Sequence, residues 1–431
     1  MRRRLMRACL TPLRLRNYRL LWSGAMLSQL GDGATWTALT WLALAHGDAA
    51  ALGVLGICYT APVIAGGFLV GPLLDRFDRR AVLVADCVLR GVAVASIPAA
   101  AAFGPVRLWQ LYLVAAVYGL LKIVPLGAVP AMLPDLVPQR ALAAASALES
   151  VSLGVGRILG PAVGGLLIPL VGGASVLLLD AASYLAFGLA VLAVRVPRSG
   201  PGPAHTVRSA PPGGWRPVVA LLRGDGVLLA ITVGFGLFNL AMGMLMVLEP
   251  WFAHDRFPGG AHTLGLILAL SGGANLAGSL AAGAVPPSDR QMLRIGVLQA
   301  VAGASLLLLL VGDLPVVLIG LVLCNVLSTP MTVSSQVLRL SRIPAGLRGR
   351  TLTLMRTVMN ATTPLGAAVA GPLLAAGAHQ ALIVLMTLAA ALPGLWLVRA
   401  YRTTSFGAEL GLVVPTPPAT PVRSARDAHH V

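Results

Sequence analysis

Residues 71–80 of this chain read GPLLDRFDRR, and five of the last six positions carry a charge. The flanking sequence is apolar, because no charged side chain occurs from 51 to 74 or from 81 to 85. A short, dense run of mixed charge between two long apolar stretches is typical of a loop that joins two membrane-spanning helices. This stretch therefore predicts a helical hairpin in a membrane.

The composition extends this interpretation to the whole chain. Of the 431 residues, 57% are hydrophobic and 11% are charged, with a mean hydropathy of +0.84. A soluble domain carries about 25% charged residues. Stretches of about 20 apolar residues, the length of helix that crosses a bilayer, predict twelve spans. Their ranges are 20–45, 52–74, 81–103, 109–132, 142–169, 174–195, 227–251, 263–285, 295–311, 315–337, 351–376 and 379–399.

The basic residues are distributed unevenly between the two sides of these spans. With the N-terminus placed inside, 26 of the 32 Lys and Arg residues fall in the inner loops and ends, and only Arg107 and Arg256 fall in outer loops. The positive-inside rule therefore places both termini in the cytoplasm, and we expect a multi-pass protein of the bacterial inner (cell) membrane. The net charge of +17 does not indicate nucleic acid, because the basic residues are scattered without interleaved aromatic residues.

The two halves of the sequence repeat each other. A shift of 206 residues places Gly165 on Gly371, and a shift of 212 places Gly53 on Gly265. A six-plus-six parallel repeat is the plan of transporters that bind substrate between their halves. The expected fold is an all-α membrane protein of twelve helices in two six-helix bundles. The expected units are an N-terminal bundle (1–197), a cytoplasmic linker (198–223), a C-terminal bundle (224–402) and a disordered cytoplasmic tail (403–431).

The opening stretch resembles the loop motif G-x-x-x-D-R-x-x-R-R of the major facilitator superfamily. The resemblance runs through most of the chain and is strongest to the drug-efflux branch, which includes macrolide-efflux and siderophore-export proteins. Independently of this resemblance, a short loop dense in both signs of charge can hold helix ends together through ion pairs that form in one state and break in another. We therefore expect a cytoplasmic gate; simple anchoring by the positive-inside rule is the alternative. The gate residues would be Gly71, Asp75, Arg76, Arg79, Arg80, Asp86 and Arg90.

A second motif lies in the fifth span and resembles the glycine-rich antiport motif of the exporters in this superfamily. Small residues allow two membrane helices to approach closely. We expect the row to pack on the stripe of the eighth span that contains Ser271, Asn275, Gly278 and Ala282. The helix-packing residues of the motif are Gly156, Gly160, Pro161, Gly164 and Gly165.

Four of the charged residues inside spans of the N-terminal half are candidates for a coupling site. A charge at a helix centre costs about 2.5–3.5 kcal/mol, so each needs a partner or a task. We expect Asp32 or Glu149 to carry the coupling proton, with Lys122 and Arg157 as counter-charges across a cavity. A static buried network that fixes helix register is the alternative. The C-terminal half offers no mid-span carboxylate, since Glu249 lies near an outer end.

Neutral polar and flexible side chains recur at helical spacing in the spans expected to enclose the substrate. Polar stripes on otherwise apolar helices indicate a wet cavity, and methionine adapts to irregular ligands; packing in the core is the alternative for the methionines. The expected substrate residues are Gln29, Trp36, Asn239, Met242, Met246, Asn325, Ser328 and Thr332.

Together these observations predict a secondary active exporter of small amphipathic organic molecules (drug, siderophore or secondary metabolite) that works by proton antiport. The chain contains no nucleotide-binding motif, no metal-ligand spacing and no nucleophile–base arrangement, so we expect no enzyme activity and no cofactor besides the proton gradient. The expected partners are the substrate, protons and membrane lipids, without an obligate protein partner. The alternatives are an importer or facilitator of a polar nutrient and, more remotely, a non-transporting sensor or assembly partner.

Overall fold

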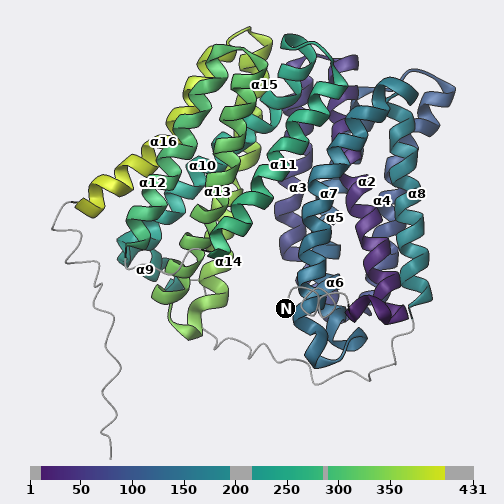
Figure 1. The fold of residues 1–431 in the computed structure, drawn as a ribbon, viewed down its shortest axis with the longest axis horizontal. Coiled ribbons are helices and arrows are strands. Elements are labelled where there is room, and N and C mark those ends of the chain that lie inside the picture. The colour runs from purple at the N-terminus through teal and green to yellow at the C-terminus, as the bar shows by residue number, and fades with distance from the viewer. Residues whose placement is uncertain (1–10, 195–215, 285–289, 403–431) are drawn as a thin grey trace, which may run out of the picture.

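The computed structural model describes residues 11–194, 216–284 and 290–402, and within these ranges the chain is helical and contains no strand (Figure 1). The first half comprises η1 (Thr11–Arg14), α2 (Arg16–His46), α3 (Ala49–Arg76), α4 (Arg79–Phe103), α5 (Leu108–Leu121), α6 (Ile123–Leu136), η2 (Gln139–Ala141), α7 (Leu142–Val171) and α8 (Gly173–Ala193). The second half comprises α9 (Arg216–Gly224), α10 (Gly226–Trp251), η3 (Phe252–Arg256), α11 (Ala261–Ala284), α12 (Gln291–Ala304), η4 (Ser305–Val311), α13 (Leu314–Arg342), η5 (Ala345–Leu347), α14 (Arg348–Asn360), α15 (Thr362–Ala375) and α16 (His379–Arg402).

The helices agree with the expected all-α membrane fold, except that one of them, α2, is less apolar than the other spans. Eleven helical segments of the described chain are long and apolar enough to cross a membrane. The first expected span (20–45) corresponds to α2, which is 31 residues long but is not among them. Its polar residues, including Gln29 and Asp32, point into the protein because α2 packs on α7 and α8. A helix shielded from lipid on these sides can carry polar groups that a lipid-facing helix cannot.

Two local features depart from the expected spans. The fourth span is divided at Lys122, which ends α5 and precedes α6. The last part of the expected linker is helical: it forms α9, which begins at Arg216 and in which Val218 is buried. The rest of the linker and the tail from 403 onward lie outside the described residues.

Close glycine contacts join the two halves. Helix α7 packs against α11, and α3 packs against α15. A methyl group added to Gly165 would lie 2.6 Å from the Cα atom of Gly265, and one added to Gly53 would lie 2.9 Å from the Cα atom of Gly371. Such distances leave no room for a side chain, so the two backbones touch directly. These four glycines are the residues that the internal repeat relates to one another.

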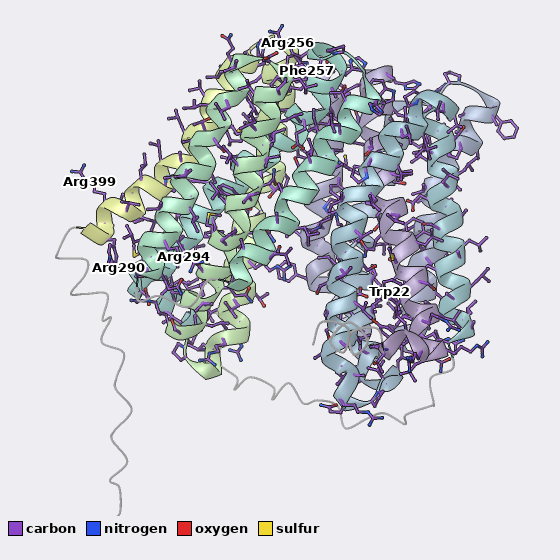
Figure 2. All side chains as sticks on the ribbon, viewed as in Figure 1. Trp22, Arg256, Phe257, Arg290, Arg294 and Arg399 are labelled. Carbon is purple, nitrogen blue, oxygen red and sulfur yellow. The ribbon has the colours of Figure 1, made fainter. Side chains whose placement is uncertain are left out.

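The contacts between the halves are concentrated at one end of the molecule. We call the end where α8 finishes and α9 begins the linker end, and the opposite end the far end. Gly53 and Gly265 lie four residues after the far-end starts of α3 and α11. The halves meet there and diverge toward the linker end (Figure 1). Arg290, Arg294 and Arg399 lie toward the linker end, whereas Arg256 lies at the far end (Figure 2).

Candidate functional site

A buried guanidinium group is the centre of a polar cluster inside the N-terminal half. Arg90 of α4 is 1% exposed, and its Nη2 atom donates to the carboxylate of Asp86, one helical turn earlier. Its Nη1 atom lies 3.5 Å from Oδ1 of Asp32 on α2 and donates to the hydroxyl of Tyr184 on α8 at 3.2 Å. The Tyr184 hydroxyl also donates to Asp32. Three helices are thus joined through one arginine.

The local sequence explains why these groups converge. Asp86 and Arg90 are four residues apart and share one helix face, which is the face of α4 that packs on α8. The guanidinium carbon lies 4.5 Å from the centre of the Tyr184 ring, so the aromatic face adds a cation–π contact to the ion pairs. The ion pairs and the Tyr184 ring therefore both hold the guanidinium group of Arg90 in place.

A third carboxylate, Asp180 of α8, extends this arrangement. It is fully buried and accepts hydrogen bonds from Thr35 at 2.5 Å and from Ser183 at 2.9 Å. Thr35 lies one turn from Asp32 on α2. No ion pair to Asp180 occurs within the described side chains. We call Asp32, Asp86, Arg90, Asp180 and Tyr184 the Arg90 cluster; it holds three carboxylates and one guanidinium.

Exposure separates the three carboxylates. The side chain of Asp32 is 16% exposed, whereas the side chain of Asp86 is 1% exposed and Asp180 is fully buried. A proton or ligand from outside the bundle can therefore reach Asp32 most directly. Asp32 is the accessible end of the buried network.

The expected counter-charges of the acids are wrong. Asp32 pairs with Arg90, not with Lys122 or Arg157. Lys122 donates instead to the hydroxyl of Tyr59. Arg157 is exposed, and Glu149 forms no ion pair with another described residue. The expected depths placed these charges in the membrane, but depth does not define the direction in which a side chain points around its helix.

The expected gate set also needs a correction. Asp86 and Arg90 are buried in the bundle and belong to the Arg90 cluster rather than to the loop between α3 and α4. Arg90 lies eleven residues into α4, or about 16 Å along the helix. The missed residues Asp180 and Tyr184 show the same four-residue spacing as Asp86 and Arg90, and an acid within the sixth span was the signal that could have revealed them.

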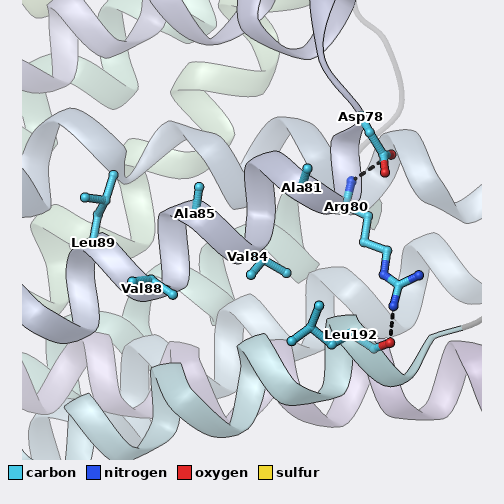
Figure 3. A pocket seen from close by; sticks show the side chains of 8 residues that line it. All are labelled: Asp78, Arg80, Ala81, Val84, Ala85, Val88, Leu89 and Leu192. Atoms are coloured by element: carbon cyan, nitrogen blue, oxygen red, sulfur yellow. Dashed lines mark hydrogen bonds between the residues drawn. The ribbon is translucent and has the colours of Figure 1, made fainter.

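The remaining loop residues contact their own half. Asp78 caps the start of α4 by accepting from the backbone N–H of Arg80, whose guanidinium donates to the carbonyl of Leu192 on α8 (Figure 3). These residues line a groove between α4 and α8. Arg79 donates to the carbonyl of Ala131 at 2.7 Å and lies 3.9 Å from Asp135 on α6.

The other members of the expected gate form no contact between the halves that the structure describes. Arg76 is exposed. The surroundings of Gly71 and of the Asp75 side chain lie outside the described part of the structure. The role of this loop as a gate stays a prediction.

The glycine row of α7 packs mainly on α2. Methyl groups added to Gly156, Gly160 and Gly164 would collide with backbone or side-chain atoms of Gln29, Gly33 and Ala34, respectively. Pro161 lies in the same row, and its side chain lies against Gly33. Only Gly165, at the far end of the row, faces α11.

The expected partner stripe of the eighth span is therefore wrong. Helix α11 approaches α7 through Gly265 and Gly272, whereas Gly278 faces Val326 and Thr329 of α13. A helix presents different faces to different neighbours, and the contact with α7 uses the face that carries the glycines nearest the far end.

The C-terminal half contains a buried carboxylate near the far end of α10, the position along the span that the sequence predicts. Glu249 of α10 is buried and accepts from the hydroxyl of Ser271 on α11 at 3.2 Å. The amide of Asn275 donates to the carbonyl of Ser271 at 3.1 Å and to the side chain of Asn325 at 2.8 Å. The sequence did not show that Glu249 is buried, which follows from the packing of α11 against the end of α10.

The expected substrate residues are distributed over both halves. Asn239 donates to the carbonyl of Met359 at 2.9 Å. The hydroxyls of Ser328 and Thr332 donate to backbone carbonyls of their own helix. The other expected substrate residues are partly exposed: Gln29, Trp36, Met242, Met246 and Asn325.

Comparison with known proteins identifies the class to which this fold belongs. The sequence pattern of the Major Facilitator Superfamily matches residues 21–367 of this chain. The chain therefore belongs to the Major Facilitator Superfamily and is a multi-pass membrane transporter, not an enzyme. Members of this family carry small-molecule substrates.

The chain is similar to proteins of known sequence and structure along most of its length. It is 28% identical to the multidrug efflux pump Tap of Mycobacterium tuberculosis over 394 residues, covering 85% of this chain and 89% of the relative. It is 28% identical to Tap of Mycolicibacterium fortuitum over 385 residues, covering 85% and 91%. A bacterial homologue of the iron transporter ferroportin in an inward-facing state matches with a TM-score of 0.68 and 17% identity, covering 89% of this chain and 98% of that one. The nucleoside transporter NupG matches with a TM-score of 0.68 and 12% identity, covering 90% and 99%.

Proposed function

We propose that this transporter exports small amphipathic organic molecules (drugs, siderophores or secondary metabolites) from the cell by proton antiport with alternating access. The similarity to Tap, a multidrug efflux pump, supports export of organic molecules. The observation that carries the coupling is the Arg90 cluster, in which one guanidinium pairs with Asp86 and Asp32, and Asp32 is the most accessible of the three carboxylates.

The proposed orientation places the linker end in the cytoplasm of a bacterial cell and in its inner membrane. Twenty-six of the 32 basic residues belong to that side, and cytoplasmic loops carry such an excess. Both termini are then cytoplasmic. In this orientation the structure is closed toward the outside and open toward the cytoplasm, which is the state from which an exporter loads its substrate.

The proposed coupling uses competition for the accessible end of the cluster. A buried carboxylate without a full charge partner is costly, and binding a proton removes that cost. When Asp32 is ionised, Arg90 and Tyr184 both bind it; when Asp32 takes up a proton, Arg90 keeps its pair with Asp86. Proton entry and substrate binding thus act on the same helix, α2, which contacts α10 and α11 of the other half.

Asp32→Asn is expected to abolish proton-driven transport while leaving downhill exchange of substrate. Asparagine accepts the hydrogen bond of Tyr184 but cannot bind or release the proton. The measurement is accumulation of a fluorescent amphipathic substrate in proteoliposomes, with and without an imposed pH gradient. Asp313→Asn, which changes an exposed carboxylate before α13, is the control and should behave as wild type.

Three outcomes would contradict this proposal. Gradient-driven transport by Asp32→Asn at the wild-type rate would remove Asp32 from the coupling path. The same loss in Glu149→Gln, with Asp32→Asn unaffected, would move the proton to α7. Uptake of a nucleoside or other polar nutrient that ignores the gradient would support an importer or facilitator instead.

A further inference from the structure

Lys122 is the only lysine in the chain and lies at the centre of a membrane span. The span Leu108–Leu136 has fourteen residues on each side of it. None of the described carboxylates lies within 4 Å of its ammonium group. The mechanism proposed above does not use this cation, because Arg90 neutralises Asp32. A half-buried ammonium in the middle of a membrane therefore has no charge partner among the described side chains.

One aromatic residue, Tyr59, contacts this ammonium, and two further aromatic rings lie close to the Tyr59 ring. Its Nζ atom lies 4.9 Å from the ring centre of Tyr59 on α3, and it donates to the Tyr59 hydroxyl. The ring of Trp36 on α2 lies 4.7 Å from that of Tyr59, with an angle of 34° between their planes. The ring of Tyr118, one turn before Lys122, lies 5.8 Å from the ring of Tyr59. We call Trp36, Tyr59 and Lys122 the Lys122 site.

The three residues lie at similar depth. Trp36 and Tyr59 are each ten residues, or about 15 Å, from the far-end limits of α2 and α3. The backbone of Lys122 lies about 21 Å from that end. Its flexible side chain extends to the hydroxyl of Tyr59. Trp36 and Lys122 are both partly exposed. The site therefore presents a ring face and a cation to a ligand at the same level of the membrane.

The opposite half approaches this level. Met246 of α10 lies beside Gly56 of α3, since a methyl group added to Gly56 would be 3.8 Å from its Cε atom. Gly56 precedes Tyr59 by one helical turn, so the two share a helix face. An adaptable thioether from the C-terminal half thus lies near an aromatic wall of the N-terminal half, where a substrate between the halves would touch both.

We infer that the Lys122 site binds an acidic group attached to a flat aromatic ring, so that the transported molecules include aromatic carboxylic acids. An ammonium has three N–H donors. The Tyr59 hydroxyl takes one of them, which leaves donors for a carboxylate. The ring of the ligand would stack on Trp36, because offset aromatic pairs are favourable. This inference rests on the proposed transport of organic molecules and specifies their chemistry.

The test measures binding of three probes that share one ring system and differ in charge: 2-naphthoate, 2-naphthamide and 2-naphthylmethylammonium. Isothermal titration calorimetry on the full chain in an uncharged detergent near neutral pH gives each dissociation constant. Wild type is expected to bind the acid at least about tenfold more tightly than the amide. Lys122→Met should remove that preference and leave the amide affinity unchanged.

Two variants separate charge from packing. Lys122→Arg keeps the positive charge and should keep the preference for the acid. Tyr59→Phe keeps the ring but removes the competing acceptor, so naphthoate affinity should be maintained or increased. If Lys122→Met does not fold, the pattern of these two variants with the three probes still tests the site.

Three results would overturn the inference. The amide or the amine could bind wild type as tightly as the acid, or Lys122→Met could weaken all three probes equally. Competitive displacement of naphthoate by phosphatidylglycerol would assign the cation to a lipid headgroup instead. Binding in detergent needs no gradient, so these results are independent of proton-driven transport. Asp32→Asn can lose coupling while naphthoate binding remains. A Lys122 variant can equally lose naphthoate binding while proton-driven transport remains.

Discussion

Gly165→Leu is expected to abolish transport while the amount of folded protein in the membrane stays close to wild type. Gly165 contacts Gly265 and the carbonyl of Ala261 across the boundary between the halves. Even a methyl group would lie 2.6 Å from both the Cα atom of Gly265 and that carbonyl oxygen. A leucine there prevents closure of the far end but leaves the packing of each half intact. The protein is therefore held in the state that is open at the far end.

The measurement is a distance between spin labels at the far end, together with transport in proteoliposomes. Labels at Asp48→Cys and Asp313→Cys, in a background without the native cysteines, report on the two halves. We expect Gly165→Leu to lengthen this distance. Gly273→Leu is the matched control, because a methyl group added to that glycine of α11 meets nothing within 4 Å. Gly160→Leu, which faces α2 in the same half, should lower the melting temperature instead.

Wild-type transport by Gly165→Leu would show that the contact between α7 and α11 does not open during the cycle. An unchanged label distance with transport lost would place the defect inside the N-terminal half. The reciprocal change at Gly53, which meets Gly371 of α15, should reproduce the result because the repeat relates the two contacts.

The overall architecture could be predicted because the features that indicate it depend only on the order of residues along the chain. Span length, the one-sided distribution of arginine and the GPLLDRFDRR loop can all be counted along the chain. The internal repeat went further, because it relates Gly53 to Gly265 and Gly165 to Gly371. The sequence did not show that Gly53 touches Gly371 and Gly165 touches Gly265, because equivalence between two halves does not say which faces meet.

The candidate site was only partly predictable for the same reason. Asp32 was identified as an embedded acid from its depth alone. Depth alone makes Lys122 and Arg157 suitable partners for it, because the sequence does not give the neighbours of each helix. Arg90 was grouped with the loop motif that precedes it, although the periodicity of α4 carries it into the bundle. Packing of α2 against α8 joins Asp32 to Tyr184, which are 152 residues apart.

The two polar sites of the N-terminal half have opposite balances of charge. The Arg90 cluster has more acids than bases, and the Lys122 site has a base without an acid. Both include residues of α2, where Asp32 and Trp36 are one turn apart. If protons bind at Asp32 and an acidic substrate binds beside Trp36, α2 senses both ligands. This proximity gives a physical route for antiport in which each ligand changes the position of the same helix.

Arg90→Met is expected to destabilise the protein by about 3–5 kcal/mol and to abolish transport. Removing one partner of a buried ion pair leaves an uncompensated charge, which is the costly outcome. Here the change leaves Asp86 almost fully buried and deprives Asp32 of its cation. Thermal melting of the purified protein in detergent measures the loss of stability. Arg294→Met, a change near the linker end (Figure 2), is the control and should stay within about 0.5 kcal/mol of wild type.

A second substitution separates the structural part of this effect from the functional part. In the double variant Arg90→Met with Asp86→Asn, the buried charge on α4 is removed together with its partner, so most of the lost stability should return. Transport should not return, because Asp32 still lacks the guanidinium that distinguishes its ionised form from its protonated form. If the double variant melts no higher than the single one, Asp86 is not the charge that Arg90 neutralises. If it transports against a pH gradient, the ion pair fixes the packing of α2, α4 and α8 and takes no part in coupling.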